Sequence, residues 1–140
     1  MRRMGSSLLE VAVVLALTGI LLAIALPRLS HVRDAAAVRS ALDEAASDFS
    51  AARQAAIARR RLVSVLVDTA AAAITVQSQG TILVASRFRL TYGVTLATNR
   101  DSAVYDGRGF GYGVSNLSLV IRRGAVADTL VVSRLGRVRW

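Results

Sequence analysis

The hydrophobic positions of this 140-residue chain change their spacing twice, and each change marks a different kind of structure. From Val11 to Pro27 no residue is charged, and Glu10 alone interrupts the apolar stretch that begins at Met4. As a helix, these 24 residues extend about 36 Å, which is enough to cross the roughly 30 Å core of a bilayer. Because Arg2 and Arg3 precede the stretch, the positive-inside rule predicts a cytoplasmic N-terminus, with the rest of the chain outside.

After Pro27 the apolar residues become periodic. A single stripe in steps of four and three is formed by Val38, Leu42, Ala45, Phe49, Ala52 and Ala56. This spacing predicts an amphipathic helix that ends at about Arg59–Arg61, with a minor ion pair between Arg39 and Asp43. Proline has no N–H to donate, so we expect a kink at Pro27. The stripe needs a domain to cover it.

From Leu62 onward the pattern is period two or short apolar runs, which indicates strands. We expect them at residues 62–67, 73–77, 81–86, 93–97, 117–122 and 130–133, with a hairpin turn at residues 123–125. No second helix of useful length is visible. The predicted fold class is α+β, with one long helix packed on an antiparallel sheet.

Composition narrows the function. The chain has 18 Lys+Arg, every one of them Arg, against 9 Asp+Glu, for a net charge of +9. With no Cys and one His, it has no disulfide framework, no catalytic Cys, no zinc site built on Cys and no multi-His metal site. His31 has no triad partners in sequence. We therefore expect no enzyme activity, no cofactor and no metal.

Two explanations compete for the N-terminal stretch. An ordinary secretory signal would be cleaved after Ala25, but a carboxylate at Glu10 costs about 2.5–3.5 kcal/mol within an apolar helix, and a disposable signal has no reason to carry it. Cleavage after Gly5 instead makes Ser6 the N-terminus, four residues before Glu10. The new amine points along its own helix axis, so it meets Glu10 of a neighbouring helix more easily than its own. Glu10 is then an assembly residue.

The segment Gly5-Ser6-Ser7-Leu8-Leu9-Glu10, followed by an apolar helix with Gly19 and Pro27, resembles the type IV prepilin signature. The resemblance implies cleavage between Gly5 and Ser6 by prepilin peptidase and N-methylation of Ser6. The family usually has Phe at the first mature position, where this chain has Ser6.

The C-terminal half resembles the GspH/FimT group of minor pilins and pseudopilins. The resemblance rests on Asp106-Gly107-Arg108-Gly109 and on the segment from Val131 to Arg139, which contains a Gly-Arg-x-Arg motif. It implies a pilin-like fold with a leader at 1–5, a transmembrane and assembly helix at 6–27, an amphipathic continuation at 28–61 and a periplasmic β domain at 62–140.

This resemblance also implies a role and partners. The chain would be a single-pass protein of the bacterial inner membrane and a minor subunit of a type II secretion pseudopilus or a type IV pilus. Its partners would be other pilin or pseudopilin subunits, prepilin peptidase, the inner-membrane assembly platform and membrane lipid.

The alternative function is DNA binding for natural transformation. The resemblance points to Gly136, Arg137 and Arg139, and strand alternation would place the two arginines on one face. Residues 87–140 hold nine Arg and three acids, a balance of +6 that suits phosphate. We expect Arg122, Arg123 and Arg134 to join them. The alternative interpretation is structural, in which the Gly-Arg-x-Arg motif only caps the fold and binds no DNA. The run Arg59–Arg61 also has two interpretations: it is either a solvated helix end with a favourable dipole interaction or a binding site for anionic lipid or nucleic acid.

Overall fold

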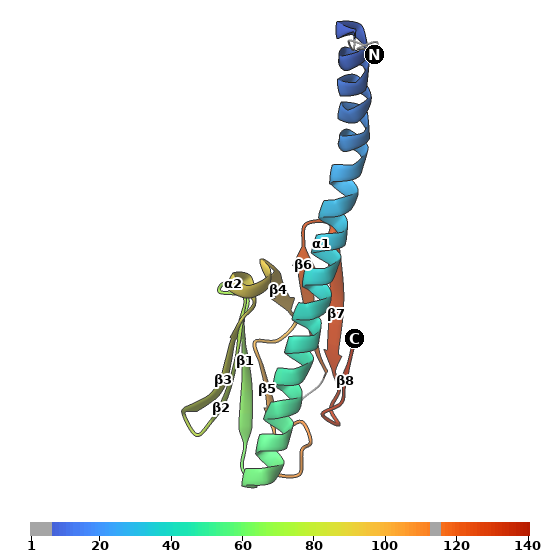
Figure 1. Cartoon of the computed structure of the whole chain (residues 1–140). Helices are drawn as coiled ribbons and strands as arrows, with labels where there is room; N and C mark the ends of the chain where they lie inside the picture. The colour runs from blue at the N-terminus through green and yellow to red at the C-terminus, as the bar shows by residue number, and fades with distance from the viewer. Residues whose placement is uncertain (1–6, 113–115) are drawn as a thin grey trace. The chain divides into compact units, whose positions relative to one another are not determined.

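The structure, a computed structural model, describes residues 7–112 and 116–140, without the side chains of residues 25–27. It separates into two compact units, Met1–Arg33 and Asp34–Trp140. Helix α1 (Leu8–Arg59) supplies the first unit and the first element of the second (Figure 1). The single long helix and its end are as the sequence predicts. The kink at Pro27 stays a prediction, because it concerns the placement of the two units relative to one another.

Helix α1 ends because Arg60 adopts a left-handed backbone conformation with φ of 49°. The Arg61 N–H then donates to the Ala56 carbonyl at 3.3 Å, and the Arg60 N–H donates to the Ile57 carbonyl at 3.3 Å. This pair of bonds is the Schellman arrangement, which satisfies carbonyls that a helix end otherwise leaves open. The stop therefore depends on backbone geometry rather than on a glycine.

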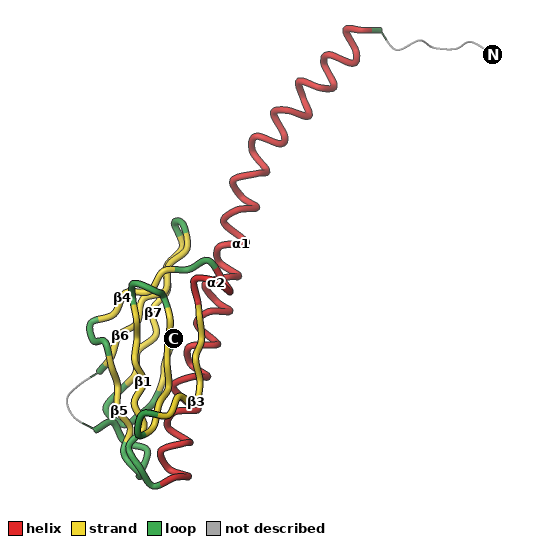
Figure 2. The backbone as a smooth tube through the Cα atoms, turned by 90° about the vertical axis from the view of Figure 1, so that its left-hand side faces the viewer, coloured by secondary structure: helices red, strands yellow, loops and turns green. Residues whose placement is uncertain are grey.

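The second unit contains two four-stranded antiparallel sheets where one sheet was expected (Figure 2). The first sheet contains, in spatial order, β3 (Thr81–Arg87), β2 (Ala73–Ser78), β1 (Val63–Asp68) and β5 (Ser102–Tyr105). The second contains, in spatial order, β4 (Thr95–Thr98), β6 (Leu117–Arg123), β7 (Val126–Val132) and β8 (Val138–Arg139). A one-and-a-half-turn helix, α2 (Phe88–Tyr92), follows β3.

The six predicted strands are all present, with ends shifted by up to four residues, and the β6–β7 hairpin turns at Gly124 as expected. The sequence did not indicate β5, β8 or α2. Strand β5 is four residues long and follows a polar turn, so it offers too short an alternation to detect. The division into two sheets depends on which strands pair, such as β4 with β6 across β5, and a local pattern does not show pairing.

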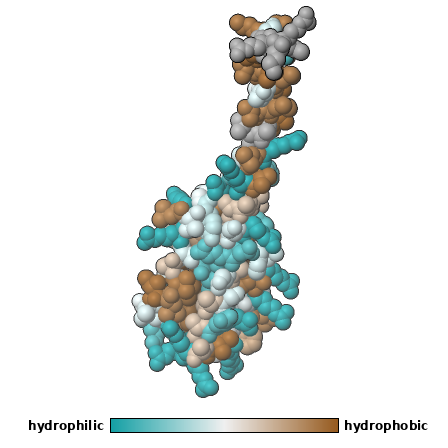
Figure 3. All heavy atoms as spheres, viewed as in Figure 1, coloured by the Kyte–Doolittle hydropathy of each residue, from teal (hydrophilic) through white to brown (hydrophobic). Residues whose placement is uncertain are grey.

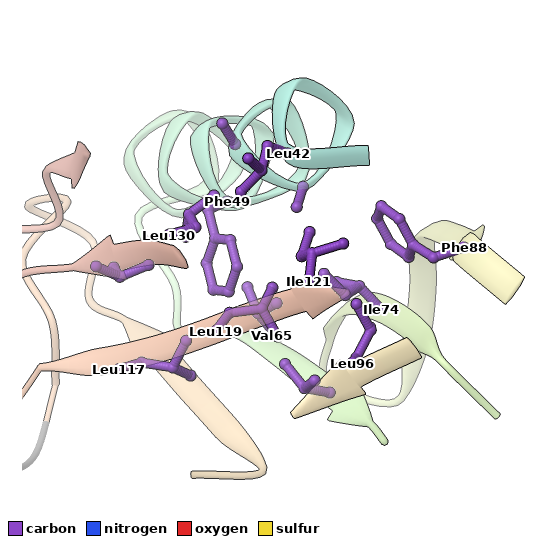
Figure 4. Close-up of a cluster of buried hydrophobic side chains, with 14 of the residues drawn as sticks. Leu42, Phe49, Val65, Ile74, Phe88, Leu96, Leu117, Leu119, Ile121 and Leu130 are labelled. Atoms are coloured by element: carbon purple, nitrogen blue, oxygen red, sulfur yellow. The ribbon is translucent and has the colours of Figure 1, made fainter. Parts of the chain in front are cut away.

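The stripe on α1 is buried against both sheets. All six predicted residues are buried, and Ala41 and Ala46 widen the stripe. Phe49 and Leu42 point down from the helix towards Val65 and Ile74 of the first sheet and towards Leu119, Ile121 and Leu130 of the second (Figure 4). Both sheets thus share one core under one helix.

Candidate functional site

The first candidate site is the apolar half of α1, residues 8–24, all of which are exposed. Leu8 is 88 % exposed, Leu15 is 66 % and Leu21 is 68 %. An 18-residue window of this helix has a mean hydropathy of 2.6, so the helix is long and apolar enough to cross a membrane. Within residues 8–24 the one side-chain hydroxyl belongs to Thr18. It donates a hydrogen bond to the Val14 carbonyl at 2.8 Å, so its donor is paired within the helix.

Glu10 lies in the first turn of α1 and is exposed. A carboxylate there interacts favourably with the free N–H groups of the helix start. Apart from the backbone of its own helix, a Cβ added at Gly19 would meet no described atom within 4 Å, so contacts within the described chain do not require a glycine there. Gly5 and Ser6, the predicted cleavage and methylation residues, lie outside the described residues.

The second candidate site begins with the turn at Asp106. Its Oδ1 accepts hydrogen bonds from the backbone N–H groups of Arg108, at 2.9 Å, and Phe110, at 3.0 Å. The Asp106 N–H donates to the Phe110 carbonyl at 2.9 Å. An aspartate that bonds its own following backbone in this way fixes a tight turn. The Asp106 carboxylate is therefore a structural group, and the turn presents Arg108 to solvent.

Gly136 packs against this turn. It has φ of 71°, and a Cβ built on it would lie 2.6 Å from the Gly109 carbonyl oxygen. That same oxygen accepts a hydrogen bond from Arg53 Nε at 2.9 Å. The Gly111 N–H donates to the Arg134 carbonyl at 3.0 Å. The two motifs that carry the C-terminal resemblance therefore contact each other, and Gly136 is needed for that contact whatever else the motif does.

These contacts gather the end of α1, the Asp106 turn and the segment before β8 at one end of the second unit. Along residues 50–61, 106–111 and 133–140 there are eight arginines and one carboxylate, which leaves a formal charge of +7. We call this surface the basic pole. Its arginines are Arg53, Arg59, Arg60, Arg61, Arg108, Arg134, Arg137 and Arg139. No described carboxylate forms an ion pair with any of them.

A groove of about 470 Å³ crosses the basic pole between α1 and the C-terminal segment. Arg53, Gln54 and Ile57 line one wall. Arg137, Arg139 and Trp140 line the other wall, together with Val138, so both predicted arginines border the same groove. The Trp140 indole N–H donates to Asp43 Oδ1 at 3.2 Å, while its side chain remains half exposed. Cations beside a partly exposed aromatic ring suit a nucleic-acid strand.

The structure corrects the placement of Arg122 and Arg123. Both lie at the other end of the second sheet, where Arg122 pairs with Ala127 of β7 while Arg139 pairs with Val131. Four residues of strand separate them by about 13 Å along β7. Arg123 is committed elsewhere: its Nε lies 3.0 Å from Asp34 Oδ1, and its Nη1 donates to the Tyr92 carbonyl. Neither residue belongs to the basic pole.

One acid in the core escaped notice in the sequence. Asp48 is 6 % exposed, and its Oδ2 has no hydrogen-bond partner in the described chain. Burial raises the pKa of Asp48 to about 6, and the nearby charge of Glu44 adds to this increase. A hydrogen bond with Ser86 acts in the opposite direction and lowers the pKa of Asp48. Glu44 accepts a hydrogen bond from the Tyr92 hydroxyl at 2.6 Å. Asp48 adjoins the hydrophobic stripe, so a buried position was predictable, but its partners were not.

The described residues contain no group of three or more His, Cys, Asp or Glu side chains that could hold a metal ion. His31 is exposed. Burial also raises the pKa of Tyr105 to about 12, so that its hydroxyl stays protonated in the core.

Known structures have the same fold. Two crystal structures of the type IV minor pilin FimU from Pseudomonas aeruginosa (strain PAO1) superpose on this chain with TM-scores of 0.62 and 0.60. They are 18 % and 16 % identical to it, over 73 % and 72 % of this chain and 86 % and 90 % of theirs. No family model matches the sequence, and a search of curated proteins finds no relative. The fold is therefore the pilin-like α+β fold that the sequence resemblance implied.

Proposed function

We propose that this chain is a minor subunit of a type IV pilus or a type II secretion pseudopilus. It is anchored in the bacterial inner membrane by residues 6–27, with its β domain in the periplasm, and is then assembled into a filament with other pilin or pseudopilin subunits. Prepilin peptidase removes residues 1–5 and methylates Ser6, and the inner-membrane assembly platform moves the subunit from lipid into the filament. It performs no chemistry itself.

The observation that carries this proposal is the exposed apolar half of α1 with its single acid at Glu10. A helix that is apolar on all sides is buried in lipid or among other helices. A filament supplies the second environment after the membrane supplies the first. In the bundle, Glu10 pairs with the Ser6 amine of a neighbouring subunit, and this pairing sets the register between subunits.

The decisive experiment measures incorporation of the chain into sheared filaments of its host. The Glu10→Ala variant should insert into the membrane at the wild-type level but be depleted from filaments by more than tenfold, because a desolvated amine is left unpaired. Glu10→Asp, which keeps the charge, should retain part of the incorporation. The matched control is Glu44→Ala, which removes a carboxylate from the other half of the same helix. Normal incorporation of Glu10→Ala would contradict the register role.

The mass of the mature chain tests processing independently. With prepilin peptidase present, we expect loss of residues 1–5 and one added methyl group on Ser6. Without the peptidase, we expect the full-length mass. A mature chain that begins after Ala25 would overturn the proposal, because it would no longer contain Glu10.

A second candidate function is DNA binding at the basic pole, in a subunit that serves DNA uptake. It is favoured by the eight arginines there, which face one carboxylate already engaged by its own turn. Each phosphate that such a surface neutralises releases counterions, so binding weakens steeply with salt. If the Gly136 segment served only to complete the fold, the domain would not need the positive charge of the surrounding arginines.

This candidate is tested with the full chain in neutral detergent and a fluorescent duplex at several salt concentrations. Replacing Arg137 and Arg139 with Ala should lower the affinity and reduce the slope of log K against log salt by about 2. The control replaces Arg122 and Arg89 with Ala, which removes the same charge outside the basic pole. Equal losses of DNA affinity in both variants would show that binding depends only on net charge and would contradict a DNA-binding site at the basic pole.

A further inference from the structure

Each sheet of the second unit ends in two edge strands, and three of these four edges are short or covered. The edge of β5 is covered because the Tyr112 N–H donates to the Val104 carbonyl at 2.7 Å and Gly111 bridges to Tyr105. Strand β8 has two residues and β4 has four. Strand β3 differs, since it has seven residues and pairs only with β2 among the described strands.

Proteins blunt free edges with proline, charges, β-bulges or very short strands. Of these devices, β3 has one register shift, at Leu83 between the residues paired with Val76 and Gln77, and one charge at its end, Arg87. Residues 81–86 of β3 read Thr-Ile-Leu-Val-Ala-Ser, with no proline and no charge. Ile82 is 62 % exposed, and Ala85 is exposed as well. A hydrophobic area covers the flank of the molecule where β2 and β3 lie (Figure 3). The row of open N–H and C=O groups specifies the conformation of an occupant: another extended strand.

Both ends of this edge are cationic. At one end lies exposed Arg87. At the other, Arg61 Nη1 donates to Gln79 Oε1 at 2.6 Å, beside a groove of about 420 Å³ that Arg59, Arg61 and Thr81 line together. Arg87 has no ion-pair partner in the described chain. A complementary strand therefore has an apolar centre and an acidic residue near each end, about 23 Å apart over seven residues.

A second copy of this chain does not supply that strand. Its own acid-flanked strand is β5, between Asp101 and Asp106, but the outer edge of β5 is covered by Tyr112 and the Asp106 carboxylate is bonded to its own turn. Two copies side by side would also bring together two chains of net charge +9. The occupant is a different subunit.

We infer that the β3 edge docks an acid-flanked, extended edge strand of a different, more acidic subunit in the filament, so that the first sheet continues from one subunit into the next. This inference rests on the proposed function, because it needs a neighbour held at the flank of the domain. Beyond the proposed function, the inference specifies which side of the domain contacts a neighbouring subunit and the chemistry of that neighbour's strand.

Hydrogen exchange of the full chain tests the inference directly. The exchange of amides in residues 81–87 is measured in detergent-dispersed chain and in filaments of the host, with β2 as the internal reference because it is paired on both sides. We expect β3 to exchange roughly tenfold more slowly in filaments, with β2 unchanged. Presence of the chain in filaments with unchanged β3 exchange would overturn this inference and leave the proposed function intact. Absence of the chain from filaments would remove both.

Two variants add a second readout. Arg87→Glu should reduce incorporation into filaments several-fold by opposing an acidic residue, whereas Arg122→Glu, at an exposed site on the other sheet, should not. Ala85→Lys should act like Arg87→Glu by placing a charge on the edge, and its thermal unfolding should match the wild type. Wild-type incorporation of both Arg87→Glu and Ala85→Lys would overturn the inference.

Discussion

The two halves of α1 distribute their apolar residues differently, and each distribution requires a different environment. In residues 8–24, Ala, Val, Leu and Ile occupy every side of the helix and all are exposed. In residues 38–56, the apolar residues keep to one stripe, which two sheets cover. The difference lies in composition as well as arrangement: residues 8–24 contain one charged residue, Glu10, whereas residues 38–56 contain five, Arg39, Asp43, Glu44, Asp48 and Arg53. An apolar surface on all sides needs a surrounding lipid or helix bundle, whereas a stripe needs only one partner surface.

The acids of the two halves differ in the same way. Glu10 is exposed, and the described chain supplies no cation for it. Asp48 is buried within its own domain beside Ser86 and Glu44. In the function proposed above, Glu10 finds its partner in a neighbouring subunit, whereas the desolvation of Asp48 is a cost to the folding of its own domain. Substitutions in either half of α1 test whether the two halves occupy different environments.

The largest effect is expected from Phe49→Ala in the buried stripe. Phe49 is fully buried between both sheets, so its truncation leaves a cavity and should lower the free energy of unfolding by about 3–5 kcal/mol. Chemical denaturation of the full chain in detergent measures this. The control is Leu15→Ala, which is exposed and should change unfolding by less than about 0.5 kcal/mol. Equal effects would mean that the two halves are not different environments.

The converse change is Leu17→Arg in the exposed half. It should leave domain unfolding untouched and make membrane insertion about 3 kcal/mol less favourable, because a cation then lies deep in the apolar helix. A protease-protection assay of insertion measures the effect, with Leu17→Ile as the apolar control. Loss of domain stability in Leu17→Arg would show that this half also packs on its own chain.

The buried acid makes domain stability depend on pH. Because the pKa of Asp48 is raised to about 6 in the folded chain, from 3.8, its contribution to stability is complete below pH 4 and is lost as pH rises through 6. Two pKa units correspond to about 3 kcal/mol. Asp48→Asn should flatten the dependence of the unfolding free energy on pH between 4 and 7. Glu10→Gln, as the matched control, should leave that dependence unchanged.

The smallest predicted effect tests the assignment of Arg123 to the fold. Arg123→Ala removes the ion pair with Asp34 and the hydrogen bond to the Tyr92 carbonyl, and should cost about 1 kcal/mol of unfolding free energy. The neighbouring Arg122→Ala should be neutral. Similar values for both would mean that the pairing with Asp34 adds nothing, and thermal unfolding of the two variants decides between these outcomes.

How much of this the sequence could predict depended on the range of each interaction. The stripe from Val38 to Ala56 and the alternation in β6 repeat over several turns or residues, so a pattern reveals them. The partnership of Arg123 with Asp34 joins residues 89 positions apart in the numbering. Nothing local to either residue indicates it, and so Arg123 was expected to join the C-terminal arginines. The basic pole was only half visible for the same reason, since it combines three segments that contact one another through Gly109 and Gly136.

The basic pole also has an evolutionary consequence. Its frame is held by one aspartate, Asp106, and by backbone bonds, such as those from the Ser133 N–H to the Arg137 carbonyl and from the Gly111 N–H to the Arg134 carbonyl. Among its arginines, Arg108, Arg134, Arg137 and Arg139 are exposed and contribute no side-chain bond to that frame. Selection can therefore change the charge of this surface, one codon at a time, without endangering the domain beneath it. Related chains that keep Gly109 and Gly136 could display very different charges there and still fold alike.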